Sequence, residues 1–276
     1  DNSGNPDWHP GLIRDCCVLK ISRKEWLMYF QASAPHGTWN IGMAKSEDGI
    51  KWKMHPKPVL DKGETYDNWF LADPEVVYVN GQFHIFYEAN RDCHNFSCGH
   101  AVSQDGVEWK KDDEPVLYPG VFGSYDSVDM SPLCLLKVKD SWHLYYFVRP
   151  GGGGPTTTGL AVSDDLVHWT KPFNHPILTP NSNWIDGAVI NRVMRLDDRY
   201  VAWVGVRSVA TFGDGTALAW SNDAINWNWA SLIVTEREDF PYRYDIDVVK
   251  SNGEYFLYYH GRSGIDLLQF AESHKT

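Results

Sequence analysis

The chain of 276 residues lacks an excess of positive charge, because 25 Lys and Arg stand against 36 Asp and Glu and give a formal net charge of −11. Nucleic-acid backbones and anionic membrane surfaces attract basic proteins, so we expect neither as a partner. The chain also lacks any run of 18 apolar residues, which argues against a membrane-spanning helix. No stretch keeps a sustained 3.6-residue apolar period, so we expect strands rather than helices to build the fold.

What the chain has instead is a repeated pattern, Ser-x-Asp-x-x-x-Trp. Its four copies begin at Ser46, Ser103, Ser163 and Ser221, and their starts are separated by 57, 60 and 58 residues. Such a regular period is typical of repeat architectures rather than of a single irregular core. With 43% hydrophobic and 14% aromatic residues, the chain can bury a large core as one domain.

Each copy of the repeat reads as four short strands. In the second copy, two apolar runs flank Asn80-Gly81, the strongest short hairpin signal, and Asn252-Gly253 stands at the matching place near the end of the chain. Four antiparallel strands in about 58 residues are typical of a β-propeller blade. We therefore predict an all-β, five-bladed β-propeller that occupies residues 1–276 as a single domain, with blades starting near residues 15, 73, 129, 186 and 245.

The fifth copy is incomplete, because its third strand ends at residues 271–273 and the chain stops before a Trp and a fourth strand. The missing segment resembles residues 8–13, whose sequence is similar to that of residues 52–60. We predict that this N-terminal segment supplies the outer strand of the fifth blade and closes the ring. Closure would remove the exposed edge that an open array presents.

Cysteine is scarce, with five residues in the chain. Cys93 and Cys98 bracket a short loop that could close as a disulfide, and Asn95 within it begins an N-glycosylation sequon. Cys16, Cys17 and Cys134 lie in apolar first strands, where buried thiols are expected. These features, together with an N-terminus that resembles that of a processed chain, favour a secreted, extracellular protein.

An aspartate stands at the start of every predicted first strand. These residues are Asp15, Asp73, Asp129, Asp186 and Asp245. First strands line the axis of a propeller, so we predict that the five carboxylates share one equivalent position and converge at one mouth of the central channel. Clustered carboxylates repel one another, which raises some pKa values and lets one group hold a proton while another stays ionised.

Arginines follow the predicted second strands, which run antiparallel to the first and end on the same face. They are Arg91, Arg149, Arg207 and Arg262. These side chains could neutralise the aspartates, or some could grip an anionic group such as a carboxylate, sulfate or phosphate by bidentate hydrogen bonds.

Aromatic residues flank the aspartates and could stack on a sugar face. They are Trp39, Trp69, Trp184 and Tyr242. Carboxylates together with His84 or His260 could hold a structural Ca²⁺ on the propeller axis, although hydrated side chains without an ion fit the sequence equally well. No cofactor is expected to be required.

The blade segments, such as Ser163 to Trp169, and the Ala72-Asp73-Pro74 motif resemble those of five-bladed glycosidases in glycoside hydrolase families 43 and 32. The resemblance covers nearly the whole chain. It implies a catalytic trio at the starts of the first strands of blades one, three and four: a base or nucleophile at Asp15, an orienting carboxylate at Asp129 and a general acid at Asp186.

One position departs from the family pattern, because Asp186 stands where those families carry a glutamate as the acid. A side chain one methylene shorter withdraws the carboxyl, and small misplacements of a reacting group are costly. The acid could therefore come from another residue, and Glu75, Asp247 and Glu88 are the alternatives.

From these features we predict a glycoside hydrolase that cleaves a furanose or pyranose unit, which could be anionic, with a carboxylate pair at the channel mouth. A non-catalytic carbohydrate-binding propeller and a lyase or transferase on the same scaffold are the alternatives. We expect a monomer with an oligo- or polysaccharide substrate. The predicted substrate-binding residues are Asp73, Glu75, Arg149, Arg207, Asp245, Arg262 and Trp184.

Overall fold

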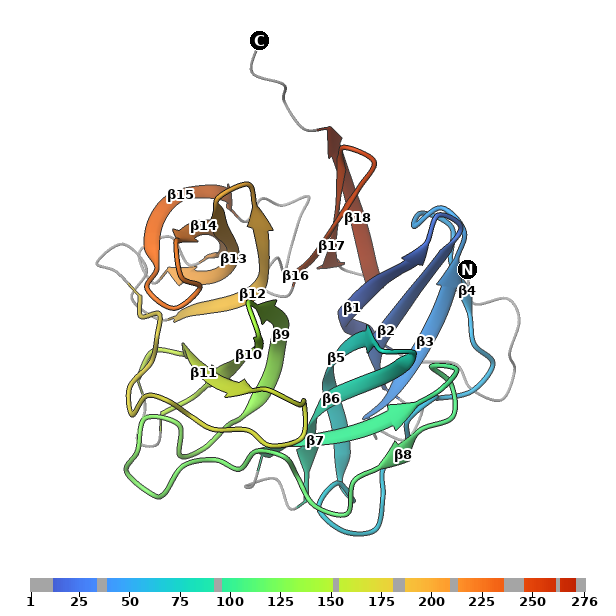
Figure 1. Cartoon of the computed structure of the whole chain (residues 1–276), viewed down its shortest axis with the longest axis horizontal. Helices are drawn as coiled ribbons and strands as arrows, with labels where there is room; N and C mark the ends of the chain where they lie inside the picture. The colour runs from blue at the N-terminus through green and yellow to red at the C-terminus, as the bar shows by residue number, and fades with distance from the viewer. Residues whose placement is uncertain are drawn as a thin grey trace.

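Five antiparallel sheets surround a central axis in the computed structural model of the chain (Figure 1). The structure describes residues 12–33, 39–91, 96–150, 154–180, 187–208, 213–235, 246–261 and 264–271. Strands make up the regular elements of these residues, so the predicted all-β five-bladed propeller is confirmed. No helix in these ranges is long and apolar enough to cross a membrane.

Each blade begins at the axis and proceeds outward in chain order. Blade one contains β1 (Ile13–Ser22), β2 (Glu25–Ser33), β3 (Trp39–Ser46) and β4 (Lys53–Met54). Blade two contains β5 (Phe70–Val79), β6 (Gln82–Asn90), β7 (Phe96–Ser103) and β8 (Lys110–Lys111). Blade three contains β9 (Ser131–Val138), β10 (Ser141–Val148) and β11 (Thr157–Ser163). Blade four contains β12 (Gly187–Leu196), β13 (Arg199–Ser208), β14 (Gly213–Ser221) and β15 (Asn228–Thr235), and blade five contains β16 (Ile246–Ser251), β17 (Glu254–Gly261) and β18 (Gly264–Ala271).

The repeated Ser-x-Asp pattern forms the turn after each third strand. In blade one, Ser46 Oγ accepts the backbone N–H groups of Asp48 and Gly49, and Asp48 Oδ1 accepts those of Ile50 and Lys51. The same bonds recur in the other three copies. The pattern therefore recurs in the chain because its Ser and Asp side chains supply the hydrogen bonds that form this turn.

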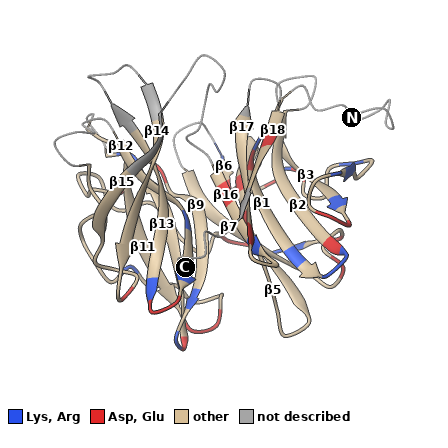
Figure 2. Ribbon diagram, turned by 90° about the horizontal axis from the view of Figure 1, so that it is seen from above, with Lys and Arg blue, Asp and Glu red and all other residues tan. Residues whose placement is uncertain are grey.

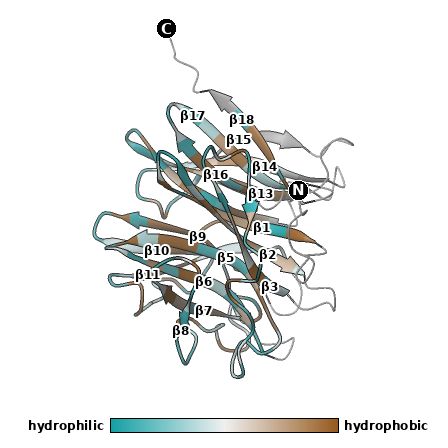
Figure 3. Ribbon diagram, turned by 90° about the vertical axis from the view of Figure 1, so that its right-hand side faces the viewer, coloured by the Kyte–Doolittle hydropathy of each residue, from teal (hydrophilic) through white to brown (hydrophobic). Residues whose placement is uncertain are grey.

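The core lies between neighbouring sheets and is rich in aromatic side chains. Figure 3 shows apolar residues along the strands and hydrophilic residues in the turns that join them. Tyrosines on second strands also tie adjacent blades together: Tyr29 donates to the carbonyl of Gly106, and Tyr145 to that of Ala224. A buried hydroxyl that finds an acceptor avoids the cost of desolvation without a partner.

Five residues at equivalent positions on the first strands form a ring of contacts at the axis. They are Cys17, Glu75, Cys134, Arg192 and Asp247. Each contacts the first strand of the next blade: Cys17 Sγ accepts from Val76 N, Glu75 Oε1 from Leu135 N, Cys134 Sγ from Val193 N, and Asp247 Oδ2 from Val18 N. Arg192 reaches Asp247 through an ion pair of 3.0 Å. We call these residues the axial ring.

The prediction that residues 8–13 form the outer strand of blade five is wrong for Leu12 and Ile13. Ile13 belongs to β1 and pairs with Ala32 of β2, and the Leu12 carbonyl accepts from Ser33 N, so both residues extend blade one rather than blade five. Residues 8–11 lie outside the described residues. Among the described residues, side chains close the ring instead: Tyr258 of blade five donates to the Gly49 carbonyl of blade one.

The cysteines of the described part are free thiols. Cys98 is a buried free cysteine, and Cys93, the other member of the possible disulfide, lies outside the described residues. Cys17 and Cys134 are buried as predicted, and burial raises the pKa of both thiols.

Candidate active site at the channel mouth

Asp15 and Asp73 occupy matching irregularities in two neighbouring first strands. The register of β1 shifts between Arg14 and Cys16, and that of β5 shifts between Ala72 and Glu75. Both aspartates adopt left-handed backbone conformations, with φ of 48° and 46°. Such conformations cost about 1–3 kcal/mol for a residue with a side chain and cluster at functional sites. The bulges aim both carboxylates away from the regular alternation of their strands.

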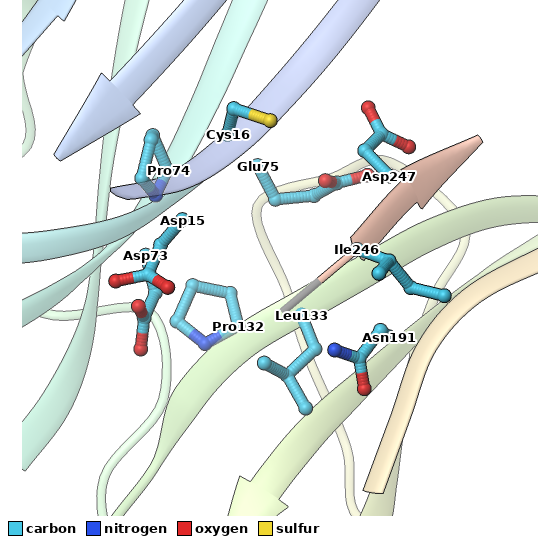
Figure 4. Close-up of a pocket in the computed structure, with 10 residues that line it drawn as sticks. All are labelled: Asp15, Cys16, Asp73, Pro74, Glu75, Pro132, Leu133, Asn191, Ile246 and Asp247. Atoms are coloured by element: carbon cyan, nitrogen blue, oxygen red, sulfur yellow. The ribbon is translucent and has the colours of Figure 1, made fainter. Parts of the chain in front are cut away.

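These two carboxylates line a pocket at the mouth of the axis. Figure 4 shows the Asp15 and Asp73 side chains next to each other, with Glu75 and Asp247 close to one another in a different part of the pocket. The lining residues are Asp15, Cys16, Asp73, Pro74, Glu75, Pro132, Leu133, Asn191, Ile246 and Asp247. Every blade contributes at least one of these lining residues, and blade four contributes Asn191. The pocket therefore forms only when the whole ring is assembled.

Asp129 lies in the loop that precedes β9 and forms an ion pair with Arg149, which follows β10. The distance from Arg149 Nε to Asp129 Oδ2 is 3.0 Å. The Asp129 carboxyl is almost fully buried, and its Oδ1 atom has no hydrogen-bond partner among the described residues. Burial raises the pKa of Asp129, and the Arg149 charge opposes that rise. A buried carboxylate oxygen without a partner is costly unless a ligand satisfies it.

Glu88 on β6 is a further buried carboxyl of the same region. Its Oε2 accepts a hydrogen bond from Ser131 Oγ. Burial raises the pKa of Glu88 well above its usual value, the charges of Asp73 and Asp129 raise it further, and the Ser131 hydrogen bond and Arg149 lower it. Glu88 therefore links the Asp73 side of the site to the Asp129 side. Figure 2 shows acidic positions on the strands near the axis, around β6 and β16.

A buried polar network fixes the loop that carries Asp129. Asp126, three residues earlier, accepts from Lys171 Nζ at 2.6 Å and from the Tyr146 hydroxyl at 3.3 Å. Tyr125 completes the network through a hydroxyl–hydroxyl contact of 2.7 Å with Tyr146. These contacts tie the loop before β9 to β10 and to Lys171.

The floor of the pocket belongs to the axial ring. Arg192 donates through Nη1 to Glu75 Oε1 at 3.0 Å and through Nε to Asp247 Oδ1 at 3.0 Å. Burial raises the pKa of Glu75 to about 7, against the lowering effect of Arg192. Glu75 and Asp247 are thus occupied by a guanidinium.

The axis does not fit the structural Ca²⁺ that the sequence suggested. Calcium takes six to eight oxygen ligands, whereas Arg192 already satisfies the axial carboxylates. No group of three or more His, Cys, Asp or Glu side chains in the described part of the chain could hold a metal ion. His84 instead contacts His100 at 3.1 Å within blade two.

The axial ring also revises the predicted equivalence of the five aspartates. Asp15 and Asp73 each lie two residues before a member of the ring, Cys17 and Glu75. The corresponding residue of blade three is Pro132, two residues before Cys134, so Asp129 does not share the position of Asp15. It reaches the same face from a loop further upstream. Asp129 lies five residues before Cys134, whereas Asp15 lies two residues before Cys17, so the two aspartates differ by three positions.

Several predicted site residues lie outside what the structure describes. They are Asp186, Asp245, Arg262 and Trp184. Arg207 belongs to β13 and its backbone pairs with that of Gly187, but its side chain is not described. Trp69, just before β5, exposes 53% of its surface, as expected of an aromatic residue available to stack on a sugar.

Comparison with known protein families identifies the family to which the chain belongs. Residues 17–193, more than half of the chain, match the model of glycoside hydrolase family 130, described as beta-1,4-mannooligosaccharide phosphorylase. The chain belongs to glycoside hydrolase family 130.

Individual relatives are distant. The chain is 25% identical over 168 residues to a beta-1,2-mannobiose phosphorylase of Thermoanaerobacter sp. (strain X514), a match that covers 54% of this chain and 52% of that protein. It is 32% identical over 126 residues to the beta-fructofuranosidase, insoluble isoenzyme CWINV6, of Arabidopsis thaliana, covering 42% of this chain and 22% of that protein. The chain thus aligns with about half or less of the length of these curated relatives.

Solved structures agree on the fold. One from the study "The GH130 family of mannoside phosphorylases contains glycoside hydrolases that target beta-1,2 mannosidic linkages in Candida mannan" superposes with a TM-score of 0.77 at 16% identity, covering 96% of this chain and 85% of that one. The predicted resemblance to families 43 and 32 was therefore correct at the level of the propeller glycosidases, and family 130 refines it.

Proposed function

We propose that this family 130 protein is a hydrolase of β-mannosides that transfers the mannosyl group to water. The observation that carries the proposal is the charge of the site. Four carboxyls of the described residues, those of Asp15, Asp73, Glu88 and Asp129, gather near the channel mouth, and the Arg149 guanidinium forms an ion pair with Asp129.

Hydrolysis and phosphorolysis make different demands on such a site. A phosphorylase must bring a phosphate ion to the sugar, which calls for cationic side chains that bind phosphate, often in bidentate fashion. Arg149 is already engaged by Asp129 through Nε. A cluster of carboxyls repels phosphate and favours activation of a neutral water molecule.

The roles follow from the two-carboxylate chemistry of glycoside hydrolysis. Asp15, aimed into the pocket by its bulge, acts as base or nucleophile, and Asp129 orients the substrate through its unsatisfied Oδ1. Asp186, at the position that the family resemblance gives to the acid, donates the proton to the leaving oxygen. The substrate class rests on the mannoside-acting relatives, and Trp69 offers a stacking face for a sugar ring.

Phosphorolysis is the second candidate, since the family is described by a phosphorylase and a relative is named as one. Arg149, Arg207 and Arg262 at the ends of second strands are the residues that would hold phosphate.

The deciding experiment incubates the protein with β-1,2- and β-1,4-mannobiose, with and without inorganic phosphate, and separates the products by anion-exchange chromatography. We expect free mannose at a rate independent of phosphate, and loss of that activity in Asp15→Asn. Mannose 1-phosphate as the main product would replace the proposal with phosphorolysis. Binding of either disaccharide without any product would make the protein a carbohydrate-binding propeller. Sucrose, included because of the fructofuranosidase relative, should remain intact.

A further inference from the structure

The far mouth of the propeller axis, opposite the candidate active site, contains a cavity of about 620 Å³. Its walls come mainly from the C-terminal halves of the five first strands, which run from the candidate site past the axial ring to this end. Arg192 lines this cavity, whereas the carboxylates that bind it, Glu75 and Asp247, line the pocket of the candidate site. The axial ring therefore separates the two hollows, and the proposed hydrolysis gives the far one no task.

Basic residues stand at one equivalent position of four blades, three residues after the axial ring. From blade one to blade five, this position carries Lys20, Tyr78, Lys137, Arg195 and Lys250, which we call the basic ring. Lys20, Arg195 and Lys250 line the cavity, and within the described part of the chain no Asp or Glu lines it. The chain as a whole has a net charge of −11, so the charge of this cavity is opposite to that of the protein.

Uncharged groups hold two of these cations in place. Lys20 Nζ donates to Ser251 Oγ and lies 5.1 Å from the centroid of the Trp26 ring. Lys137 Nζ lies 5.0 Å from the centroid of the Trp142 ring. A hydroxyl and an aromatic face orient an ammonium group but bring no formal negative charge. A bound anion at this mouth would supply that charge.

The walls between the two rings are apolar. Both intervening positions carry an aliphatic residue or methionine in every blade. Small-molecule pockets of roughly 300–1,000 Å³ are typically lined in this way, with a few polar groups that fix the orientation of the ligand. Apolar walls give nothing to a hydrated inorganic ion, whereas an aliphatic body buried against them is removed from water. The second of the two positions carries Leu19, Val77, Leu136, Met194 and Val249.

We propose that the far mouth is a binding site for an amphiphilic organic anion of the medium-chain carboxylate class. The aliphatic body of the ligand lies along the apolar walls, and its carboxylate lies at the basic ring, where Lys20 and Arg195 bind it. The proposal does not depend on the reaction at the candidate active site, because it requires binding alone.

The first test titrates the protein with decanoate, below its micellar concentration, by isothermal titration calorimetry. We expect saturable binding at one site, and binding about tenfold weaker for octanoate, which has two methylenes fewer to bury. Decyltrimethylammonium, of similar length and opposite charge, should not bind, and inorganic phosphate should not compete with decanoate. Absence of decanoate binding, or equal binding of the cationic amphiphile, would overturn the proposal. Phosphate that displaces decanoate would show that the apolar walls take no part and would overturn the ligand class.

Substitutions at the basic ring test where the carboxylate lies. Lys20→Gln and Arg195→Gln should each weaken decanoate binding about tenfold, because each removes a charge-assisted hydrogen bond. Lys45→Gln is the matched control: it removes an exposed lysine from β3 of blade one, outside the cavity, and should leave the affinity unchanged. Unchanged affinity in both ring variants would overturn the proposal.

Methionine methyl groups report the position of the aliphatic body without any substitution at the ring. Met194 lines the cavity, whereas Met28 and Met54 line another hollow between blades one and five. In protein labelled with ¹³C at methionine methyls, decanoate should shift the resonance that is absent from Met194→Leu. Shifts confined to Met28 and Met54 would place the ligand in the other hollow and overturn the proposal. If a ring variant does not fold, the labelled wild type still decides the question.

Discussion

At the scale of single residues, the site depends on backbone conformations that the sequence does not display. Asp15 and Asp73 could be identified as candidates from their place in the repeat, yet nothing in the sequence shows that both adopt left-handed φ values. Aspartate adopts left-handed φ values more readily than most residues do. A glycine would have marked these positions in the sequence, whereas an aspartate does not. Asp129 lies three residues further upstream of its axial-ring residue than Asp15 does, and it therefore reaches the site from the loop before β9.

Strain at Asp15 predicts a separation of stability from activity. Glycine adopts a φ of 48° without steric cost, so Asp15→Gly should relieve the strain and raise the free energy of unfolding by about 1 kcal/mol, after the greater entropy of the unfolded chain is allowed for. The same change removes the proposed base and should lower kcat by about 10²–10⁴-fold. Urea unfolding and mannoside assays measure the two effects.

Asp15→Asn is the matched control, because asparagine tolerates the left-handed region but lacks the charge. It should lose activity to a similar extent without the gain in stability. A lower free energy of unfolding for Asp15→Gly than for Asp15→Asn would show that the bulge stores no strain.

At the scale of elements, the sequence was most informative, since each Ser-x-Asp copy makes the turn that its residues predict. The prediction of a fourth strand in every blade was less accurate. In blade three the outer position is taken by isolated bridges, Val162 with Thr170 and Thr158 with Leu178. Outer strands are short and partly solvated, so few side chains mark them in the sequence.

The turn hydrogen bonds predict the cost of a single deletion. Ser163 is buried, and its Oγ accepts the N–H groups of Asp165 and Leu166 at 3.2 and 2.9 Å. Ser163→Ala leaves these donors without that acceptor, so we expect the free energy of unfolding to fall by about 1–3 kcal/mol. Chemical unfolding monitored by tryptophan fluorescence measures the change.

Ser141→Ala is the control for that variant, because Ser141 Oγ makes an exposed hydrogen bond to Asp164. Its free energy of unfolding should change by less than about 0.5 kcal/mol. Equal effects of the two substitutions would mean that the turn serine has no special part in holding the blade.

At the scale of the whole molecule, the period of the repeat sufficed to predict five blades. It did not predict which contacts close the ring or which side chains meet at its axis. Side chains of five different blades meet at the axis, and the equivalent positions carry Cys, Glu, Cys, Arg and Asp. No single residue type is shared by the five positions, so no motif could reveal the axial ring. Its contacts join positions as far apart as Val18 and Asp247, which only the closed ring brings together.

The axial ring makes stability depend on pH in an unusual direction. Glu75 has a pKa of about 7 in the folded protein, above the value of about 4.3 expected in the unfolded chain. A carboxyl with a raised folded pKa contributes its full stabilisation below the unfolded pKa and loses it as pH rises through the folded pKa. Glu75→Gln keeps an oxygen to accept from Leu135 N and Arg192 but cannot ionise. The free energy of unfolding of the wild type relative to Glu75→Gln should therefore fall by about 3 kcal/mol between pH 4.5 and pH 8.

Urea unfolding of both proteins at a series of pH values measures this difference and cancels every other titrating group. The expected sign runs against an ordinary ion pair, in which Arg192 would hold Glu75 ionised and the relative stability of the wild type would rise with pH. A rise would mean that the attraction of Arg192 outweighs the burial of Glu75. A fall would mean that Asp247 is the main counterion of Arg192 and that a neutral Glu75 joins blades two, three and four by hydrogen bonds at the floor of the site.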